Sequence, residues 1–285
     1  MLKHTPAPPR DIFDRHRRAM RRERRPEAPG FFDHHIAEML LERLDDVSRN
    51  FTNALVIGAR NANLITAVRQ RCTRLTIVES SPTLAGRIGA ICTDEDALGV
   101  EPENYDLILW PGGLEGVNDV PAALLRCRYA LKPDGLLLGC VIGDGSFPKL
   151  RSAMAAADAP IATARMHPQL SLQAVGDLLH KIGLALIVTD VEQLSLSYTT
   201  LYALVRDVRD AALGNVLSGP VHPISRAGFE RSHAIFCDEG GARTTEQLRI
   251  IHFSGWAPDA SQPKPARRGS ATASLEQALR PSRPE

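Results

Sequence analysis

Short apolar runs alternate with amphipathic segments along the first half of the chain. Four runs have the length and apolar composition of buried strands: 54–58, 74–80, 105–110 and 136–143. Three segments between them carry apolar residues at helical spacing: 63–71, 81–91 and 119–131. Because strands that alternate with helices form βαβ units, we predict an α/β domain with a mostly parallel central sheet flanked by helices.

Further elements lie on both sides of this alternation. Apolar residues recur at helical spacing within 31–47, which predicts an amphipathic helix with Asp33 as its N-cap. Residues 171–198 predict a helix followed by strand material that extends or flanks the sheet. Residues 201–213 predict one more helix.

Turn and cap signals divide the chain. "PEAPG" at 26–30 breaks it, and "KPDG" at 132–135 predicts a tight turn. Ser81, followed by Pro82 at the first helical position, is a candidate N-cap. We therefore expect a basic N-terminal segment over 1–30, an α/β domain over 31–257, and a mobile tail rich in Pro, Ser, Ala and Arg over 258–285.

Composition excludes several classes of protein. The 34 basic and 33 acidic side chains give a net charge of +1, so the whole chain has no bulk attraction to nucleic acid or membrane. No apolar run approaches the ~20 residues that span a bilayer, so no integral membrane segment is expected. The five cysteines form no Cys-x-x-Cys pair, which favours reduced thiols in a cytosol-like compartment.

Charge is uneven at the N-terminus, where eight arginines lie between residues 10 and 25. The acids Asp11, Asp14 and Glu23 interrupt the cluster, so we interpret it as part of the mature protein rather than as a transit peptide. The cluster predicts either a docking surface for an acidic partner or a solvated helix.

The turn after the first predicted strand is the candidate site of chemistry. Gly58 ends that strand, and Glu79 ends the next one 21 residues later, near the ~20 expected between a phosphate-side glycine and a ribose-binding acid. This spacing favours an adenosine-type ligand. The alternative is an ordinary turn glycine and a solvated acid at a strand end.

Three motifs carry a resemblance to a known family. "YDLILW", followed by a helix and "LKPDG", is similar to class I S-adenosylmethionine (SAM)-dependent methyltransferase domains. "IFDRHRRAMRRER", "VNDVPAALLRCRYALKPDG" and the C-terminal "PARRGSATASLEQAL" resemble one subfamily. This subfamily comprises the methyltransferase-like assembly factors of respiratory complex I, some of which are linked to arginine hydroxylation. They are relatives of the biotin-biosynthesis methyltransferase.

The resemblance implies a Rossmann-like class I methyltransferase fold with SAM as its cofactor. Carried onto this chain, it implies five cofactor contacts: Gly58, Ala59, Glu79, Ser80 and Trp110. It also implies a protein substrate, a complex I subunit or an assembly intermediate. The expected location is the bacterial cytoplasm, either free or peripheral at the inner membrane, or the mitochondrial matrix if the source is eukaryotic.

The first motif departs from the family pattern. The family reads approximately "LDLGCGxG", whereas this chain has Val56 in place of the acid, and Arg60 and Ala62 in place of glycines. Loss of a charged hydrogen-bond partner costs ~1.5–3 kcal/mol. Two hypotheses therefore stay open: an enzyme that binds SAM and modifies a protein side chain such as arginine, and a non-catalytic assembly factor with a degenerate SAM site. No catalytic residue can be named.

Histidines give weaker signals. His34, His35 and Glu38 share a helix start and have donors suited to a metal, but a solvated helix face is the favoured interpretation. His167 and His222 each precede a proline and are expected near the mouth of the site.

Overall fold

A computed structural model of the chain describes residues 11–26, 28–58, 61–159, 163–220, 222–237 and 242–263. Its centre is a seven-stranded sheet in the order β3-β2-β1-β4-β5-β7-β6. The strands are β1 (Phe51–Ile57), β2 (Cys72–Glu79), β3 (Ile91–Cys92), β4 (Tyr105–Pro111), β5 (Leu131–Ile142), β6 (Ala185–Tyr198) and β7 (Thr244–Trp256).

Parallel pairing dominates this sheet, as the alternating pattern predicts. β1 pairs in parallel with β2 and with β4, and β4 pairs in parallel with β5. Only β7 runs against its neighbours, lying antiparallel to both β5 and β6. The carboxyl ends of β1, β2 and β4 therefore meet at one edge of the sheet, which is where open α/β sheets bind ligands.

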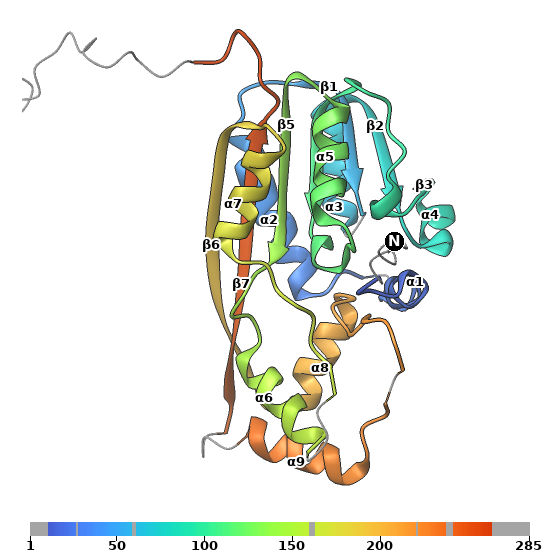
Figure 1. Ribbon diagram of the computed structural model, residues 1–285, viewed down its shortest axis with the longest axis vertical. Coiled ribbons are helices and arrows are strands. Elements are labelled where there is room, and N and C mark those ends of the chain that lie inside the picture. The colour runs from blue at the N-terminus through green and yellow to red at the C-terminus, as the bar shows by residue number, and fades with distance from the viewer. Residues whose placement is uncertain are drawn as a thin grey trace, which may run out of the picture.

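Helices cover both faces of the sheet (Figure 1). The helices α2 (Phe31–Asp45) and α3 (Ala62–Gln70) lie on one face, and α5 (Val120–Ala130) and α7 (Leu172–Lys181) lie on the other. Side chains of β1 alternate between two hydrophobic clusters, because Val56 packs with α2 and Leu55 packs with α5. This alternation places the position that carries the family's acid inside the hydrophobic layer.

A second group of helices lies beyond the carboxyl ends of the parallel strands (Figure 1). It consists of α6 (Pro148–Ala157), α8 (Leu201–Asp210) and α9 (Arg226–Phe236). The short helix α1 (Arg15–Glu23) also lies at this edge of the sheet and contacts α4 (Pro82–Ile88). None of the described helices is long and apolar enough to cross a membrane.

Two local predictions need correction. Asp33 is not the N-cap of α2: the helix begins two residues earlier after Gly30, and the Asp33 carboxylate is buried in an ion pair with Arg25. The "KPDG" segment is not a free turn but an irregular part of β5, with Asp134 at φ +58° and a register shift against β4. The cap predicted at Ser81 is confirmed, since its hydroxyl oxygen accepts from the Leu84 N–H at 3.2 Å.

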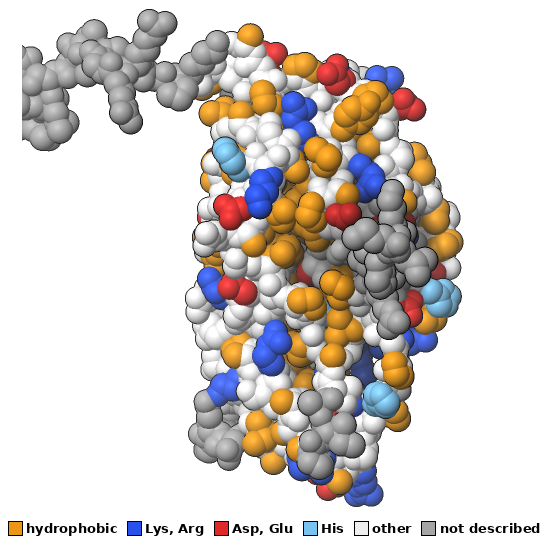
Figure 2. All heavy atoms as spheres, viewed as in Figure 1, with side chains coloured by type: hydrophobic (Ala, Val, Ile, Leu, Met, Phe, Trp, Pro, Cys, Tyr) orange, Lys and Arg blue, Asp and Glu red, His pale blue; other side chains and the backbone are white. Residues whose placement is uncertain are grey.

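Charge is dispersed over the face that carries α5 and α7. Figure 2 shows basic and acidic side chains scattered among uncharged ones there, with no large patch of one sign. That distribution fits the net charge of +1. Ala59, Arg60 and residues 264–285, which include most of the predicted tail, lie outside the described residues.

Candidate functional site

Gly58 and Glu79 come together at the carboxyl edge of the sheet. Their strands are adjacent and parallel, and the Gly58 N–H donates to the carbonyl oxygen of Val78 at 2.9 Å. Gly58 has φ +77°, a conformation that favours glycine. The sequence thus predicted correctly that this glycine and this acid share one location.

The hollow between them is filled by Arg22 from α1. The Arg22 guanidinium donates from Nε to Glu79 Oε1 at 2.6 Å and from Nη2 to Oε2 at 2.5 Å. Only 3% of the Arg22 side chain and none of the Glu79 side chain is exposed. A Cβ added to Gly58 would lie 3.1 Å from Arg22 Nη2. The guanidinium therefore lies where a ligand against the backbone of Gly58 would lie.

A second arginine of α1 closes the neighbouring part of this edge. Arg18 donates both terminal nitrogens to the Glu95 carboxylate at 2.9 and 3.0 Å, and Nη2 also donates to the carbonyl oxygen of Gly113 at 2.8 Å. A Cβ on Gly116 would lie 3.1 Å from Arg18 Nε. Because residues 18 and 22 are four apart, one face of α1 presents both guanidiniums to the sheet.

Polar contacts, rather than an apolar stripe, hold α1 in place. Asp14 caps the helix by accepting from the Arg17 N–H at 2.9 Å. Just before it, the Phe13 N–H donates to Asn118 Oδ1 at 2.8 Å, and the Asp14 N–H donates to the carbonyl oxygen of Val216 at 2.8 Å. The buried side chains of α1 itself are Arg18 and Arg22. The helix thus binds its own domain through buried ion pairs.

Burial and pairing act in opposite directions on these charges. Burial alone would raise the pKa of Glu79, but the charge and the hydrogen bonds of Arg22 outweigh it and lower this pKa. Burial likewise opposes the charge of Arg22, and Glu79 outweighs it and raises the pKa of Arg22. Both groups are therefore charged at neutral pH. The hydrogen bonds between them replace the hydration that each charge loses on burial.

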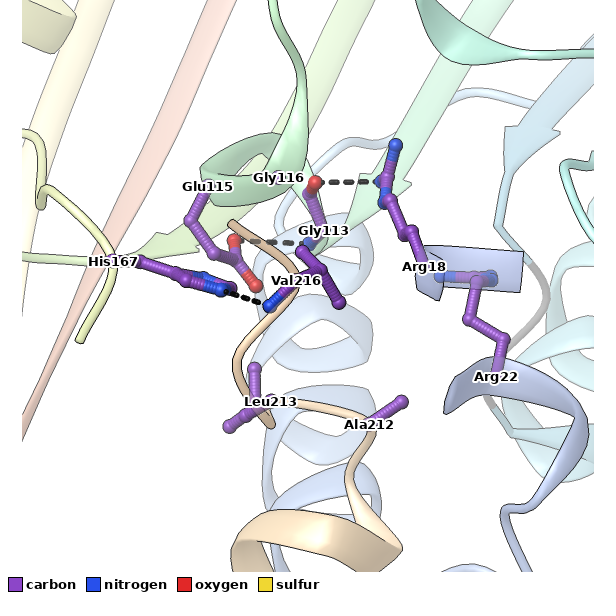
Figure 3. A pocket seen from close by; sticks show the side chains of 9 residues that line it. All are labelled: Arg18, Arg22, Gly113, Glu115, Gly116, His167, Ala212, Leu213 and Val216. Atoms are coloured by element: carbon purple, nitrogen blue, oxygen red, sulfur yellow. Dashed lines mark hydrogen bonds between the residues drawn. The ribbon is translucent and has the colours of Figure 1, made fainter. Parts of the chain in front are cut away.

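A cavity of about 20 Å³ remains beside the two arginines. Figure 3 shows Arg18 and Arg22 on one side of it and Glu115 and His167 on the other. The His167 Nε2 accepts from the Val216 N–H at 2.9 Å, and burial lowers the pKa of this histidine. Since one water molecule needs ~10–15 Å³, this cavity is large enough for about one water molecule and too small for a cofactor.

The other expected contacts are placed differently. Ser80 follows Glu79, and its buried hydroxyl has no hydrogen-bond partner among the described residues. Trp110 does not reach the hollow, because its side chain is fully buried in the hydrophobic cluster beneath α5. Ala59 cannot be placed, since it lies outside the described residues.

The histidines that the sequence singled out do not form a common site in the structure. His35 forms a hydrogen bond with Glu192 at 2.8 Å, whereas His34 and Glu38 are exposed. Over the described part of the chain, no three His, Cys, Asp or Glu side chains are arranged to hold a metal ion. His222 lines a separate cavity, away from Glu79.

Three arginines of the basic N-terminal segment differ from both interpretations given by the sequence. The side chains of Arg18, Arg22 and Arg25 are only 9%, 3% and 8% exposed, and each is ion-paired within the domain. These three are therefore neither a docking surface nor a solvated face. Sequence reasoning missed Arg18 and Arg22 as site residues, although their spacing on one helix face was a visible signal.

As folded, the site does not accommodate an adenosyl group. A positive φ at Gly58, the strand-end carboxylate of Glu79 and the Ser80 hydroxyl, which has no partner among the described residues, are features that suit one. Arg22, however, occupies both the carboxylate and the space against Gly58. We therefore assign no reaction step through SAM in this arrangement.

The strand order and the helices on both faces define a Rossmann-like methyltransferase fold. N-methyltransferase NodS from Bradyrhizobium japonicum, solved with S-adenosyl-L-homocysteine, matches 85% of this chain and 100% of its own with a TM-score of 0.50 at 15% identity. The YcgJ protein from Bacillus subtilis matches 79% of this chain and 99% of its own with a TM-score of 0.55 at 14% identity. These likenesses establish the fold.

Named relatives cover nearly the whole chain. The mitochondrial arginine-hydroxylase NDUFAF5 of Danio rerio is 26% identical over 93% of this chain and 88% of its own, and that of Homo sapiens is 25% identical over 93% and 82%. A malonyl-[acyl-carrier protein] O-methyltransferase of Methylovorus is 23% identical over 82% of this chain and 85% of its own. The resemblance inferred from the sequence motifs is thus confirmed. No protein-family model matches the chain.

Proposed function

We propose that this protein acts in the assembly of respiratory complex I by binding a complex I subunit or an assembly intermediate. The likeness to proteins named for arginine hydroxylation, which covers 93% of this chain, supports this proposal. A location in the bacterial cytoplasm or at the inner membrane surface fits it.

The observation that weighs most on mechanism is the Arg22–Glu79 pair. It fills the adenosyl position with a side chain of the same chain, and Val56 has replaced the family's acid within the hydrophobic layer. These two features favour the non-catalytic alternative, in which the fold serves as a binding scaffold. A binding scaffold of this kind needs no cofactor.

The enzymatic alternative keeps specific support. Gly58, Glu79 and Ser80 retain the backbone conformation, the carboxylate and the unpartnered hydroxyl of a ligand-binding strand end. In this alternative SAM binds after Arg22 leaves Glu79, and an arginine of a protein partner is modified.

Titration with SAM separates the two alternatives. We would compare the wild type with Arg22→Lys, which keeps the charge but loses the bidentate fork, and with Arg22→Met, provided that circular dichroism shows each variant folded. Binding near micromolar by either variant but not by the wild type supports the enzyme held closed by Arg22. If none of the three proteins binds SAM at millimolar concentration, the scaffold is supported. If a variant binds SAM and the added substitution Glu79→Gln abolishes that binding, the bound SAM is assigned to this site.

The assembly role has its own test. Deletion of the gene in the source organism should lower the amount of assembled complex I in membranes, measured by native electrophoresis with NADH dehydrogenase staining. The wild-type gene should restore it. Unchanged complex I in the deletion strain would contradict the role, whatever the outcome with SAM.

A further inference from the structure

An apolar cavity of about 260 Å³ lies within the helical group beyond the sheet, apart from the Arg22–Glu79 hollow. Its apolar wall includes side chains of α6, α8 and α9 and of Phe147 just before α6: Phe147, Leu150, Met154, Leu201, Val205 and Phe229. The volume is close to the ~300 Å³ at which ligand pockets in proteins begin. An apolar group of ligand size therefore fits inside.

Two arginines that have no partner among the described residues border this cavity. Arg21 comes from α1 and Arg209 from the end of α8, and both contribute to its lining. Within the described ranges, neither guanidinium has an ion pair or a side-chain hydrogen bond. The third arginine of the wall, Arg165, is different, because the Asp158 carboxylate binds it at 2.5 and 2.6 Å.

Three positive charges act on Arg21. Burial lowers the pKa of Arg21, and the positive charges of Arg24, Arg209 and Arg17 lower it further. A bound anion would relieve this repulsion and replace the water that the half-buried guanidinium has lost. The bordering charges thus select an anionic head group.

The cavity wall also limits the chemistry of the part of the ligand that lies inside it. Asn215 is the one uncharged polar side chain among the lining residues. A peptide in such a cavity would leave backbone N–H and C=O groups without partners, at a cost of ~1–3 kcal/mol each. A hydrocarbon chain has no such groups, so the chemistry of the wall favours an alkyl body over a peptide.

We propose that this cavity binds a medium-chain carboxylate, with the alkyl chain among the side chains of α6, α8 and α9 and the carboxylate between Arg21 and Arg209. This site is separate from the proposed complex I function and does not depend on it. Carboxylates are the natural partners of guanidiniums in such a position, because each oxygen accepts a charge-assisted hydrogen bond.

Decanoate is the probe, and isothermal titration calorimetry is the measurement. We expect the wild type to bind decanoate, and Arg21→Gln and Arg209→Gln each to weaken binding about tenfold through loss of a charged hydrogen bond. Val205→Phe should weaken it by filling the cavity. Arg206→Gln is the matched control, because Arg206 is on the same helix, 64% exposed and outside the cavity wall.

The head group is tested separately with neutral decanol. Decanol should bind the wild type about tenfold more weakly than decanoate and should be insensitive to Arg209→Gln. Three results would overturn the proposal: no decanoate binding by the wild type at about 1 mM, equal binding of decanol and decanoate, or wild-type affinity in both arginine variants. Neither arginine has a partner to lose within the described structure, so both variants are expected to fold.

Discussion

The Arg22 guanidinium and the Glu79 carboxylate face each other edge to edge, at 2.6 and 2.5 Å, with almost no exposure to solvent. The pair joins α1 to the end of β2, so residues 57 positions apart in the chain close one edge of the sheet. Because α1 is fixed by this contact, the stability of the sheet depends on a residue that precedes its first strand in the sequence.

The first prediction concerns the strength of this pair. Arg22→Met leaves Glu79 as a buried charge without its partner, and we expect a loss of ~3–5 kcal/mol in the free energy of unfolding. Glu79→Gln should cost a similar amount, and the double variant should cost less than the sum. Urea unfolding followed by circular dichroism measures each value.

An exposed ion pair serves as the control for that series. Arg226 and Glu230 are 95% and 65% exposed, and Arg226→Gln should cost no more than ~0.5 kcal/mol. Equal losses in Arg22→Met and Arg226→Gln would show that the buried pair does not hold the domain together.

The second prediction separates backbone strain from crowding at Gly58. Gly58→Ala and Gly89→Ala both place a side chain at positive φ, +77° and +66°. A Cβ at 58 meets Arg22 at 3.1 Å, whereas nothing lies within 4 Å of one at 89. We expect ~1 kcal/mol of destabilisation from strain at both sites and a further loss at 58. Equal losses, measured in parallel urea titrations, would contradict the close approach of Arg22.

The third prediction is a pH dependence. Burial, assisted by the charge of Arg18, lowers the pKa of His167, although Glu115 acts in the opposite direction. Below the unfolded value of ~6.5 the unfolded chain then binds more protons than the folded one, so stability falls as the pH drops through that value and is fully present above it. His252, whose pKa burial also lowers, adds a change of the same sign.

Thermal unfolding at about pH 7.5 and about pH 5.5 tests this sign. The melting temperature of the wild type should be lower at the acidic pH, and the difference should shrink in His167→Gln. A higher melting temperature at the acidic pH would contradict the assignment.

The fourth prediction concerns Asp106, which the structure shows in a structural position. Its carboxylate accepts from the Thr52 N–H at 2.7 Å and from the Asn53 N–H at 2.9 Å, which joins the start of β1 to β4. Asp106→Ala should cost ~1.5–3 kcal/mol, and Asp106→Asn, which keeps one acceptor oxygen, should cost about half of that. Asp45→Ala, at an exposed ion pair, should change the unfolding midpoint little.

Local pattern was enough to predict the parallel part of the sheet. The runs that form β1, β4 and β5 are apolar over several consecutive residues, because helices cover both faces of these strands, and β2 is buried towards its end. By contrast, β7 carries polar residues in its first half, "TTEQLR", where only β6 pairs with it, and its sequence did not predict a strand. The helix α9 was missed as well.

The closure of the candidate site was beyond sequence reasoning for a different reason. Arginines close to each other in a polar helix have many possible acidic partners, and the choice of Glu79 for Arg22 and Glu95 for Arg18 is made by the tertiary fold. Trp110, which the resemblance implied as a cofactor contact, lies near the end of β4, where the alternation of the strand directs its side chain into the core.

The antiparallel strands at the sheet edge have one further consequence. From Thr244 to Arg249, β7 is paired with β6 alone, and this two-stranded ribbon carries Glu246, whose carboxylate accepts from the backbone N–H groups of Lys149 and Leu150 at the start of α6. This ribbon is one attachment of the helical group that holds the apolar cavity, because side chains of α6, α8 and α9 also pack in the same hydrophobic cluster as α2 and β5. Exchange of the amide hydrogens in the ribbon, compared with exchange in β5, would therefore show whether the helical group opens separately from the sheet.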